Sequence, residues 1–319
     1  MPHVLVAGKI HEAGRAVLRA AQGVSVDFID DGADAAFAPL MPRADALLVR
    51  TQKVTAALIA CAPNLKIVSR HGVGYDAVDV AALNARKIPL AIVGDVNSRT
   101  VAEHTLMMML NLAKRTAEFD HATRHGGWAI RNGFSTTELY GKTLLVIGFG
   151  RIGRRVARLA AAFEMNVLAH DPFLAARDIA DLGAEPVASI DDALPLADFL
   201  TVHMPLADGG ALIGAKRLAM LKPGAIVINA ARGGLIDEDA VAAAVDGGRL
   251  AGAGLDVFLA EPPPADHPLL RSAKTVLSPH SAGLTQECAA RMAVAAAQNI
   301  LDFFAGRLDP TLVVNRSAL

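Results

Sequence analysis

The sequence predicts an α/β fold with two parallel-sheet domains joined by two long helices, and an active site in the cleft between the domains. First, short apolar runs alternate with amphipathic stretches along almost the whole chain, the pattern of strand–helix units around a parallel sheet. Second, this series of apolar runs occurs twice. Third, the length of 319 residues suits two domains, at roughly 100–200 residues each.

Each expected strand is a short apolar run bounded by polar or glycine-containing segments. In the first series the strands are Val4–Ala7, Val24–Ile29, Ala46–Val49, Lys66–Ser69 and Leu90–Val93. In the second series they are Thr143–Ile147, Asn166–Ala169, Phe199–His203, Ala225–Asn229, Gly252–Val257 and Thr275–Leu277. Helices are expected between the strands, for instance at Thr55–Cys61 and Asp79–Arg86.

Two long helices are expected to connect the halves. The first begins near Thr100, where Thr100-Val-Ala-Glu103 has a capping-box pattern, and it continues through Leu106–Lys114 with apolar residues at helical spacing. The second runs from Thr285 to about Ala305 and returns the chain to its starting domain. We therefore expect a discontinuous first domain, residues 1–98 plus 287–319, and a second domain of residues 99–286.

The composition indicates an ordered protein without a strongly charged surface. Apolar residues make up 53% of the chain, enough to offset the entropy lost on ordering. The 31 basic residues nearly balance the 32 acidic ones, so neither nucleic acid nor a membrane surface is an expected partner. We see no signal peptide, no apolar stretch long enough to span a membrane and no disulfide framework, and we expect a cytoplasmic location.

A strand followed by Gly148-Phe-Gly150-Arg-Ile-Gly153 and an amphipathic helix is typical of dinucleotide-binding domains. The first glycine permits a tight turn, the second lets the backbone approach a pyrophosphate, and the third lets helix and strand pack closely. Asp171, 18 residues beyond Gly153, stands where a carboxylate accepts the ribose hydroxyls of NAD and repels the 2′-phosphate of NADP. We interpret the region as a Rossmann domain that binds NAD. A surface Asp at a turn is the alternative for Asp171.

Three side chains at or just after expected strand ends are candidates for the chemistry. A nicotinamide cofactor implies hydride transfer, which needs a proton donor near the substrate oxygen. His280 lies at the carboxyl edge where open α/β sheets bind ligands, and the guanidinium of Arg232 suits the oxygens of a keto acid. Glu261 is placed to stabilise a protonated His280 if it accepts a hydrogen bond from the imidazole. Taken singly, a surface Arg or a solvated Glu is the simpler interpretation.

These motifs together resemble the D-isomer-specific 2-hydroxyacid dehydrogenases, in the family's order and over nearly the whole chain. They are Gly148–Gly153 with Asp171, Ala231–Asp237, Asp256–Pro262 and Pro279–Gly283. The resemblance implies a Rossmann cofactor domain, a flavodoxin-like substrate domain, Arg232 as the substrate-polarising residue, His280 as acid/base and Glu261 as its partner. It also implies cofactor contacts by Thr105, Gly148, Gly150, Arg151, Ile152, Gly153, Asp171, His203, Pro205, Ala230, Asp256 and Gly283.

The first half of the chain carries a further part of the resemblance. The loop with Val73 and Gly74 resembles the family's carboxylate-binding loop, in which those amides would hold the substrate anion. A glycine turn without a ligand is the alternative. Arg50 and Arg70 match positions that help to hold the distal phosphate in D-3-phosphoglycerate dehydrogenases, the branch that the chain resembles most, although either could pair with local carboxylates. His71 stands where a small residue is commoner and could reshape this site.

The resemblance therefore implies an NAD-dependent oxidoreductase that interconverts a D-2-hydroxy acid and its 2-keto acid. It favours 3-phosphoglycerate and phosphohydroxypyruvate as the substrate pair. A hydroxypyruvate or glyoxylate reductase is the alternative within the family. An NAD(H)-sensing binding protein, like the co-repressors that share this fold, is the alternative from another class. A homodimer is implied, with the helix Thr100–Lys114 as the expected interface. No metal is expected, because His121 and His125 have the spacing of a metal site but no third ligand.

Overall fold

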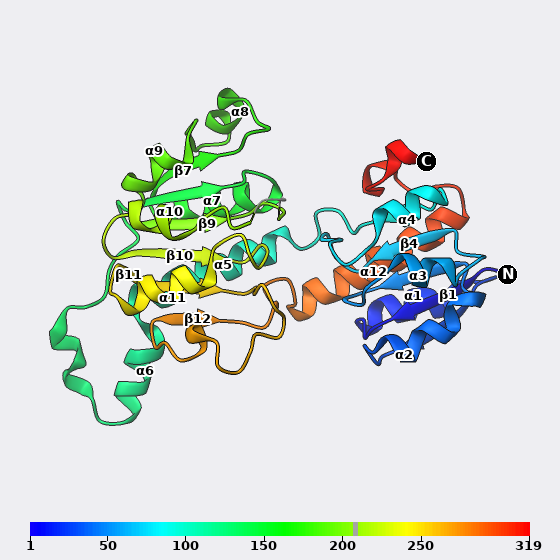
Figure 1. Ribbon diagram of the computed structural model, residues 1–319, viewed down its shortest axis with the longest axis horizontal. Helices are drawn as coiled ribbons and strands as arrows, with labels where there is room; N and C mark the ends of the chain where they lie inside the picture. The colour runs from blue at the N-terminus through cyan, green and yellow to red at the C-terminus, as the bar shows by residue number, and fades with distance from the viewer. Residues whose placement is uncertain (207–209) are drawn as a thin grey trace. The chain divides into compact units, whose positions relative to one another are not determined.

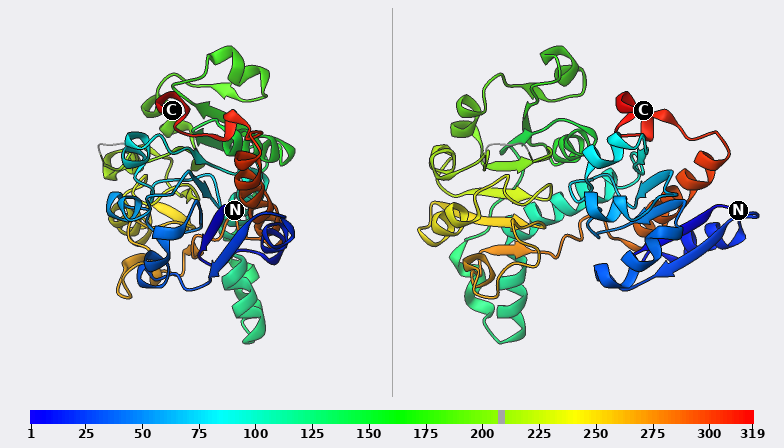
Figure 2. Two further views of the ribbon diagram at one scale, coloured as in Figure 1. Left: turned by 90° about the vertical axis from the view of Figure 1, so that its right-hand side faces the viewer. Right: turned by 45° about the vertical axis from the view of Figure 1, so that its right-hand side comes forward.

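The computed structural model describes residues 1–206 and 210–319, and the chain forms two compact units (Figure 1). The first unit comprises Met1–Asn97 and Leu284–Leu319, and the second comprises Ser98–Gly283. Both ends of the chain therefore belong to the first unit, as Figure 2 also shows. The fold class predicted from the sequence is confirmed, because each unit is built around a parallel sheet.

The first unit contains a five-stranded parallel sheet in the order β2-β1-β3-β4-β5. Its strands are β1 (His3–Ala7), β2 (Ser25–Ile29), β3 (Ala46–Val49), β4 (Ile67–Arg70) and β5 (Leu90–Ala91). The central strands are rich in Val, Leu and Ile because both of their faces are covered. β3 pairs with β4 so that Val49 lies opposite Arg70, which places the loops after both strands at the same edge of the sheet.

Helices cover both faces of this sheet. They are α1 (Glu12–Ala20), α2 (Asp34–Phe37), α3 (Ala56–Ala60), α4 (Val80–Ala85) and α12 (Gln286–Phe304), with 3₁₀ turns at Ala38–Arg43, Pro310–Leu312 and Arg316–Ala318. Alternate residues of β1 point to opposite sides, so Leu5 belongs to the core under α2, α3 and α4 and Val6 to the core under α1 and α12. The buried hydroxyl of Ser69 donates to the carbonyl oxygen of Ala296, 2.8 Å away, which fixes α12 on the sheet.

The second unit contains a seven-stranded parallel sheet in the order β12-β11-β10-β9-β6-β7-β8. The strands are β6 (Thr143–Ile147), β7 (Asn166–His170), β8 (Glu185–Pro186), β9 (Phe199–Val202), β10 (Ala225–Asn229), β11 (Leu250–Leu255) and β12 (Thr275–Leu277). From β6 the chain first adds strands on one side and then, from β9, on the other. β6 and β9 are therefore neighbours at the point where the strand order reverses, and doubly wound sheets bind their ligands at the carboxyl ends of such strands.

Two helical layers cover this second sheet. The helices are α5 (Ser98–Lys114), α6 (Thr116–Arg124), α7 (Arg151–Ala162), α8 (Ala176–Asp181), α9 (Ile190–Ala193), α10 (Ala215–Met220) and α11 (Glu238–Asp246), with 3₁₀ turns at Trp128–Gly133, Leu194–Leu196 and Pro268–Leu270. The core on one face includes residues of α5 and α7, and the core on the other includes residues of α9, α10 and α11. β11 approaches α5 closely, because a Cβ on Gly254 would lie 3.0 Å from the Cβ of Met108.

Some element boundaries differ from the sequence prediction for identifiable reasons. The expected capping box at Thr100 is wrong, since α5 begins at Ser98, whose hydroxyl accepts a hydrogen bond from Arg155 Nε at 2.7 Å. The strand expected at Leu90–Val93 ends at Ala91, because the next amide, that of Ile92, donates to Leu312 of the C-terminal segment. The helix α6 was not predicted. None of its residues is buried, and Figures 1 and 2 show it projecting from the sheet of its unit.

Candidate active site

The glycine motif forms the turn between β6 and α7. Gly148 has a φ of +89°, and a Cβ at this position would lie 2.6 Å from the carbonyl oxygen of His203. A Cβ on Gly153 would lie only 2.1 Å from the carbonyl oxygen of Gly148, so only glycine fits where α7 crosses β6. A Cβ on Gly150, in contrast, would meet no heavy atom of residues 1–206 and 210–319 within 4 Å, so these residues leave space beside the turn.

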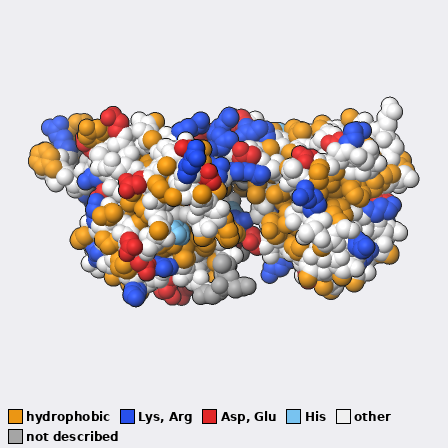
Figure 3. All heavy atoms as spheres, turned by 90° about the horizontal axis from the view of Figure 1, so that it is seen from above, with side chains coloured by type: hydrophobic (Ala, Val, Ile, Leu, Met, Phe, Trp, Pro, Cys, Tyr) orange, Lys and Arg blue, Asp and Glu red, His pale blue; other side chains and the backbone are white. Residues whose placement is uncertain are grey.

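The first turn of α7 is open to an anion. Its N-cap, Gly150, has no side chain to cap the first amides, and these N–H groups with the positive end of the helix dipole suit an anionic ligand. Figure 3 shows Lys and Arg side chains gathered near one edge of the second unit, the unit at the left of that view. Arg154 of α7 fastens the turn, since its Nε donates to the carbonyl oxygen of Phe149 at 2.8 Å.

Asp171 lies directly after β7, the strand beside β6. One of its carboxylate oxygens accepts the amide of Phe149 at 2.8 Å, and the other accepts the amide of Phe173 at 2.9 Å. The contact with Phe149 ties this carboxylate to the glycine turn. A carboxylate has about four acceptor sites, so two remain for the hydroxyls of a ribose.

His203 follows β9, at the point where the strand order reverses. Burial lowers its pKa to about 3, so the ring is neutral in the folded protein at neutral pH. Its Nε2 lies 3.0 Å from the hydroxyl of Thr201, while its buried Nδ1 has no hydrogen-bond partner among the described residues. The ring therefore suits a cofactor-adjacent position better than proton transfer.

His280 and Glu261 form a close pair in the second unit. Nδ1 of His280 lies 2.8 Å from Oε2 of Glu261, and the amide of Phe258 donates to the other oxygen, Oε1, at 3.1 Å. Because the carboxylate can only accept, the imidazole donates from Nδ1, and Nε2 is left to face a substrate. Both side chains are partly exposed, at 54% for His280 and 39% for Glu261, so a ligand can reach them.

A buried carboxylate holds the turn that carries His280. Asp256 is 1% exposed, and its two oxygens accept the amides of Ser281 and Ala282 at 2.8 and 2.9 Å. His280 itself has a φ of +51°, a conformation that few residues other than glycine adopt and that a surrounding network must maintain. The sequence offered Asp256 as a cofactor contact, and the structure shows this carboxylate engaged with the His280 turn.

His104 extends this network from α5. Its Nε2 lies 2.9 Å from the hydroxyl of Ser278, which in turn donates to Asp256 at 2.5 Å. No local sequence pattern predicts this link, because His104 and Ser278 are 174 residues apart.

Arg232 lies in the loop after β10, next to the loop that carries Glu261. Its Nη1 donates to the carbonyl oxygen of Ala231 at 2.6 Å, and its own carbonyl accepts the side-chain amide of Asn229 at 2.8 Å. β10, β11 and β12 are adjacent strands, and Arg232, Glu261 and His280 follow them in that order. The three candidate catalytic residues thus come from neighbouring loops at the carboxyl edge of one sheet.

The remaining cofactor candidates lie around the same edge of the second unit. Val101, Ala230 and Ala282 form a small buried cluster with Ile152, so the starts of α5 and α7 meet the loops after β10 and β12. Thr105 is completely buried and donates its hydroxyl to the carbonyl oxygen of Val101, at 2.9 Å. The other candidates in this part of the chain are exposed Pro205, half-buried Gly283 and exposed Arg151.

The substrate candidates Arg50, Arg70, Val73 and Gly74 belong to the first unit, at the carboxyl edge of its sheet. Nη1 of Arg50 donates to the carbonyl oxygen of Lys9 at 3.0 Å, whereas Nη1 of Arg70 donates to the carbonyl oxygen of His71. A pocket of about 340 Å³ lies beside Arg50. It is lined by Lys9, Ile10, His11, Arg50, His71, Leu284 and Ala289.

His71 makes this pocket unusual. The side chain is 4% exposed, and its buried Nε2 has no hydrogen-bond partner among the described residues. Burial, with the charges of Arg50 and Arg70, lowers its pKa to about 4. The ring is therefore neutral at physiological pH, and the positive charge at the pocket comes from Arg50 and Lys9.

Residues 1–206 and 210–319 contain neither a candidate metal cluster nor a candidate membrane span. No group of three or more His, Cys, Asp or Glu side chains gathers there in a way that could hold a metal ion. Within the same residues, no helix is long and apolar enough to cross a membrane.

The chain matches known proteins over both units. A sequence profile described as "D-isomer specific 2-hydroxyacid dehydrogenase, NAD binding domain" matches residues 106–282. A D-3-phosphoglycerate dehydrogenase from Mycobacterium leprae is 42% identical over 315 residues, 98% of this chain and 59% of that relative. This chain therefore spans somewhat more than half the length of that relative.

Two other similar proteins match along most of their length. A glyoxylate reductase from Aeropyrum pernix is 38% identical over 278 residues, 85% of this chain and 83% of that protein. A D-lactate dehydrogenase from Aquifex aeolicus, solved in complex with NAD and lactic acid, has a TM-score of 0.88 at 26% identity and 98% coverage of both chains. With the profile match in the second unit, these similarities establish that the chain belongs to the D-isomer specific 2-hydroxyacid dehydrogenase family.

Proposed function

We propose that this protein is an NAD-dependent oxidoreductase that interconverts a D-2-hydroxy acid and its 2-keto acid. The observation that carries the proposal is the contact between Glu261 and Nδ1 of His280, which leaves Nε2 of the imidazole for a substrate oxygen. The contact occurs in the unit that contains the family's NAD binding domain. We assign cofactor binding to residues 99–286 and substrate binding to residues 1–98 with 287–319.

The second unit fits a dinucleotide. Gly148 and Gly153 admit no side chain, Gly150 has open space beside it, and the uncapped first turn of α7 suits a pyrophosphate. Asp171, joined to the glycine turn through Phe149, would hold the ribose of NAD. When bound, the nicotinamide accepts a hydride from the hydroxy acid or supplies one to the keto acid.

The residues of this chain supply charge and a proton. In keto-acid reduction, Arg232 binds the carboxylate and polarises the carbonyl, while protonated His280 delivers a proton from Nε2 to the substrate oxygen. Glu261 orients the imidazole and balances its positive charge. In the reverse direction, neutral His280 takes the proton from the hydroxyl group.

We propose 3-phosphoglycerate and phosphohydroxypyruvate as the substrate pair, because the pocket beside Arg50 offers positive charge for a second anionic group. The similarity to D-3-phosphoglycerate dehydrogenases agrees with this choice. The similarity to a glyoxylate reductase favours the alternative, a smaller keto acid without a second anion.

The test is keto-acid reduction by the purified protein with NADH and with NADPH. We expect kcat/KM to be highest for phosphohydroxypyruvate among phosphohydroxypyruvate, hydroxypyruvate, glyoxylate and pyruvate, and higher with NADH than with NADPH. A preference for glyoxylate or hydroxypyruvate would support the reductase alternative. Tight NADH binding without turnover of any of the four acids would instead support the NAD(H)-sensing alternative.

We further propose a homodimer in the cytoplasm. α5 and the projecting α6 are the proposed interface elements, because no residue of α6 is buried and two large aromatic side chains nearby, Trp128 and Phe134, are 62% and 91% exposed. The two cysteines, Cys61 and Cys288, are free thiols, as a reducing compartment requires. Light scattering of wild-type protein and of Trp128→Ser checks the assembly, and a wild-type monomer would contradict it.

A further inference from the structure

Two consecutive backbone amides in the loop after β11 each bind a different glutamate. The amide of Phe258 donates to Oε1 of Glu261 at 3.1 Å, and the amide of Leu259 donates to Oε1 of Glu238 at 2.6 Å. Glu261 contacts His280 with its other oxygen. The peptide segment that supports the candidate acid/base pair is thus itself held by a second carboxylate.

Glu238 is the first residue of α11, and its side chain is 10% exposed. Its second oxygen, Oε2, lies 3.1 Å from Nε2 of His267, whose side chain is 11% exposed. Nδ1 of His267 accepts the amide of Leu269 at 3.3 Å, so this nitrogen carries no proton. The imidazole proton therefore lies on Nε2 and is donated to Glu238, which leaves the carboxylate with two donors.

The same loop packs directly against the loop of Arg232. A Cβ on Gly233 would lie 2.0 Å from the carbonyl oxygen of Phe258 and 2.5 Å from the amide nitrogen of Leu259. The ring of Phe258, 7% exposed, contacts the ring of His267 edge-on with centroids 5.8 Å apart. A shift of the Phe258–Leu259 backbone would therefore move both the support of Glu261 and the surface against which the Arg232 loop rests.

We propose that Glu238 and His267 are positioning residues, a largely buried pair that fixes the Phe258–Leu259 backbone so that Glu261 keeps its contact with His280. The proposal rests on the proposed dehydrogenase function, because it assigns the pair a role in that reaction. Among the described residues, the side chains of Glu238 and His267 make their hydrogen bonds and ring contact with Phe258, Leu259, Leu269 and each other, so each acts through the loop. The pair also joins the start of α11 to the loop of Glu261 and so keeps two of the three catalytic loops in register.

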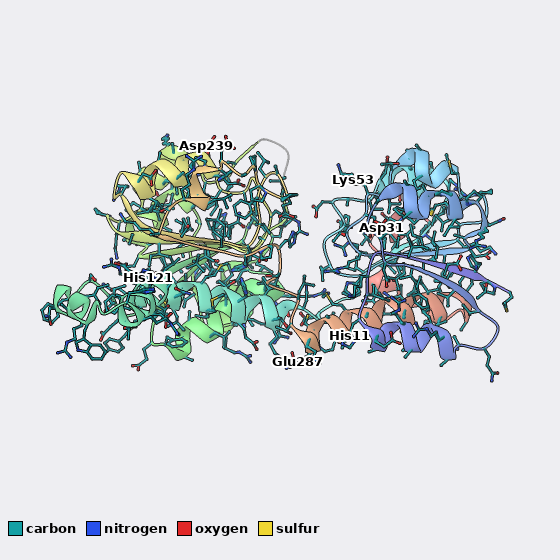
Figure 4. The ribbon with its side chains drawn as sticks, turned by 90° about the horizontal axis from the view of Figure 1, so that it is seen from below. His11, Asp31, Lys53, His121, Asp239 and Glu287 are labelled. Atoms are coloured by element: carbon teal, nitrogen blue, oxygen red, sulfur yellow. The ribbon has the colours of Figure 1, made fainter. Side chains whose placement is uncertain are left out.

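Glu238→Gln is a sharp test of this pair because a carboxamide cannot satisfy both of its donors. If the amide oxygen accepts Leu259, the NH₂ group faces the Nε2 proton of His267. If His267 moves its proton to Nδ1, that proton faces the amide of Leu269. Every arrangement leaves one donor against another, so the loop must shift. Asp239→Asn is the matched control, since Asp239 is the next acidic residue in the first turn of α11 and is exposed at the surface (Figure 4).

A double-mutant cycle tests whether Glu238 acts through Glu261. We expect Glu238→Gln to lower kcat for keto-acid reduction about tenfold, with the Kd for NADH changed less than about twofold, and Asp239→Asn to leave both unchanged. In a Glu261→Gln background, the further loss caused by Glu238→Gln should fall below about twofold, because the positioned group is already disabled. Fully additive losses would overturn the proposal, as would an unchanged kcat in Glu238→Gln.

Hydrogen–deuterium exchange of peptides that cover residues 256–262 tests the anchor without any turnover. We expect faster exchange in Glu238→Gln and in His267→Gln, and wild-type exchange in Asp239→Asn. Equal exchange in all four proteins would overturn the proposal. If the wild-type protein turns over none of the keto acids, the proposed function fails, and faster exchange would still establish the pair as the anchor of this loop.

Discussion

The hydroxyl of Ser278 lies 2.5 Å from Oδ1 of Asp256, and this contact joins the segment after β12 to the end of β11. The same carboxylate accepts the amides of Ser281 and Ala282, the two residues that follow His280 on the way to α12. A single buried acid therefore fixes the turn in which His280 adopts its positive φ. The candidate acid/base residue is held by its neighbours in space more than by its own conformational preference.

Replacement of Asp256 by Ala should destabilise the second unit and disable catalysis together. The substitution leaves buried amide donors without an acceptor, which costs about 2–3 kcal/mol of the free energy of unfolding. We expect a lower urea midpoint and, for the folded variant, a lower kcat than that of the wild type. Asp239→Ala, on the exposed first turn of α11, should change the free energy of unfolding by less than about 0.5 kcal/mol. Equal stability of the two variants would contradict the role of Asp256.

Substitutions at two glycines of the nucleotide turn should distinguish an effect on stability from an effect on NADH binding. Gly153→Ala places a Cβ 2.1 Å from a backbone oxygen, so we expect a loss of about 1–3 kcal/mol in the free energy of unfolding. The methyl group of Gly150→Ala meets no heavy atom within 4 Å among the described residues, so the substitution should leave stability within about 0.5 kcal/mol of wild type. Fluorescence titration should nevertheless show weaker NADH binding in Gly150→Ala, because the methyl group fills the space beside the turn. Unchanged NADH affinity in that variant would place the cofactor elsewhere.

Acid should destabilise the protein through His71 and His203. Burial lowers the pKa of His203 to about 3, and burial with the nearby Arg50 and Arg70 lowers that of His71 to about 4. Each group titrates near 6.5 in the unfolded chain, so below that pH the unfolded state binds more protons. The stability conferred by the neutral rings is present above pH 6.5 and is lost as the pH falls towards the pKa of each histidine in the folded protein. At pH 5 the loss in the free energy of unfolding is about 2 kcal/mol per residue.

Urea unfolding at pH 7 and pH 5 measures this effect. His71→Gln should reduce the difference between the two free energies of unfolding by about 2 kcal/mol, because it removes one of the two groups. The same pH dependence in wild type and His71→Gln would show that His71 is not held neutral in the folded protein.

Arg50→Gln should raise the KM for phosphohydroxypyruvate about tenfold or more, because a charged hydrogen bond to the second anion is lost. The KM for glyoxylate, which has no second anion, should change less than about twofold. Lys53→Gln is the control, since Lys53 is an exposed cation of the same unit (Figure 4). Equal changes in the KM values for the two keto acids would show that Arg50 does not recognise a distal anionic group.

The sequence was sufficient to predict features that depend on local patterns. Apolar runs predicted the strands Thr143–Ile147 and Ala225–Asn229 with the boundaries that the structure has, because buried parallel strands are continuous apolar segments. The spacing of Gly148, Gly150 and Gly153 predicted a turn between a strand and a helix, which the structure confirms. The hypothesis of a contact between His280 and Glu261 agrees with the observed 2.8 Å distance, while their catalytic roles stay predictions.

Other features required the three-dimensional structure. The contact of His104 with Ser278 and that of Glu238 with His267 join residues on separate elements, and no short motif links their positions. Helix α6 escaped prediction because it lacks a buried apolar stripe, the usual signal of a helix on a core. The capping box expected near Thr100 lies two residues inside α5, which begins at Ser98, and the bond from Arg155 to Ser98 joins residues 57 positions apart.

The most direct test of the central claim compares wild type with His280→Asn in phosphohydroxypyruvate reduction by NADH. Asn keeps a polar side chain at this position but cannot deliver the proton, so kcat should fall by about 10²–10⁴. The Kd for NADH, measured by fluorescence, should stay within about twofold of wild type, because His280 makes no part of the glycine turn. A variant with wild-type kcat would contradict the assignment of His280 as the acid/base residue and with it the proposed mechanism.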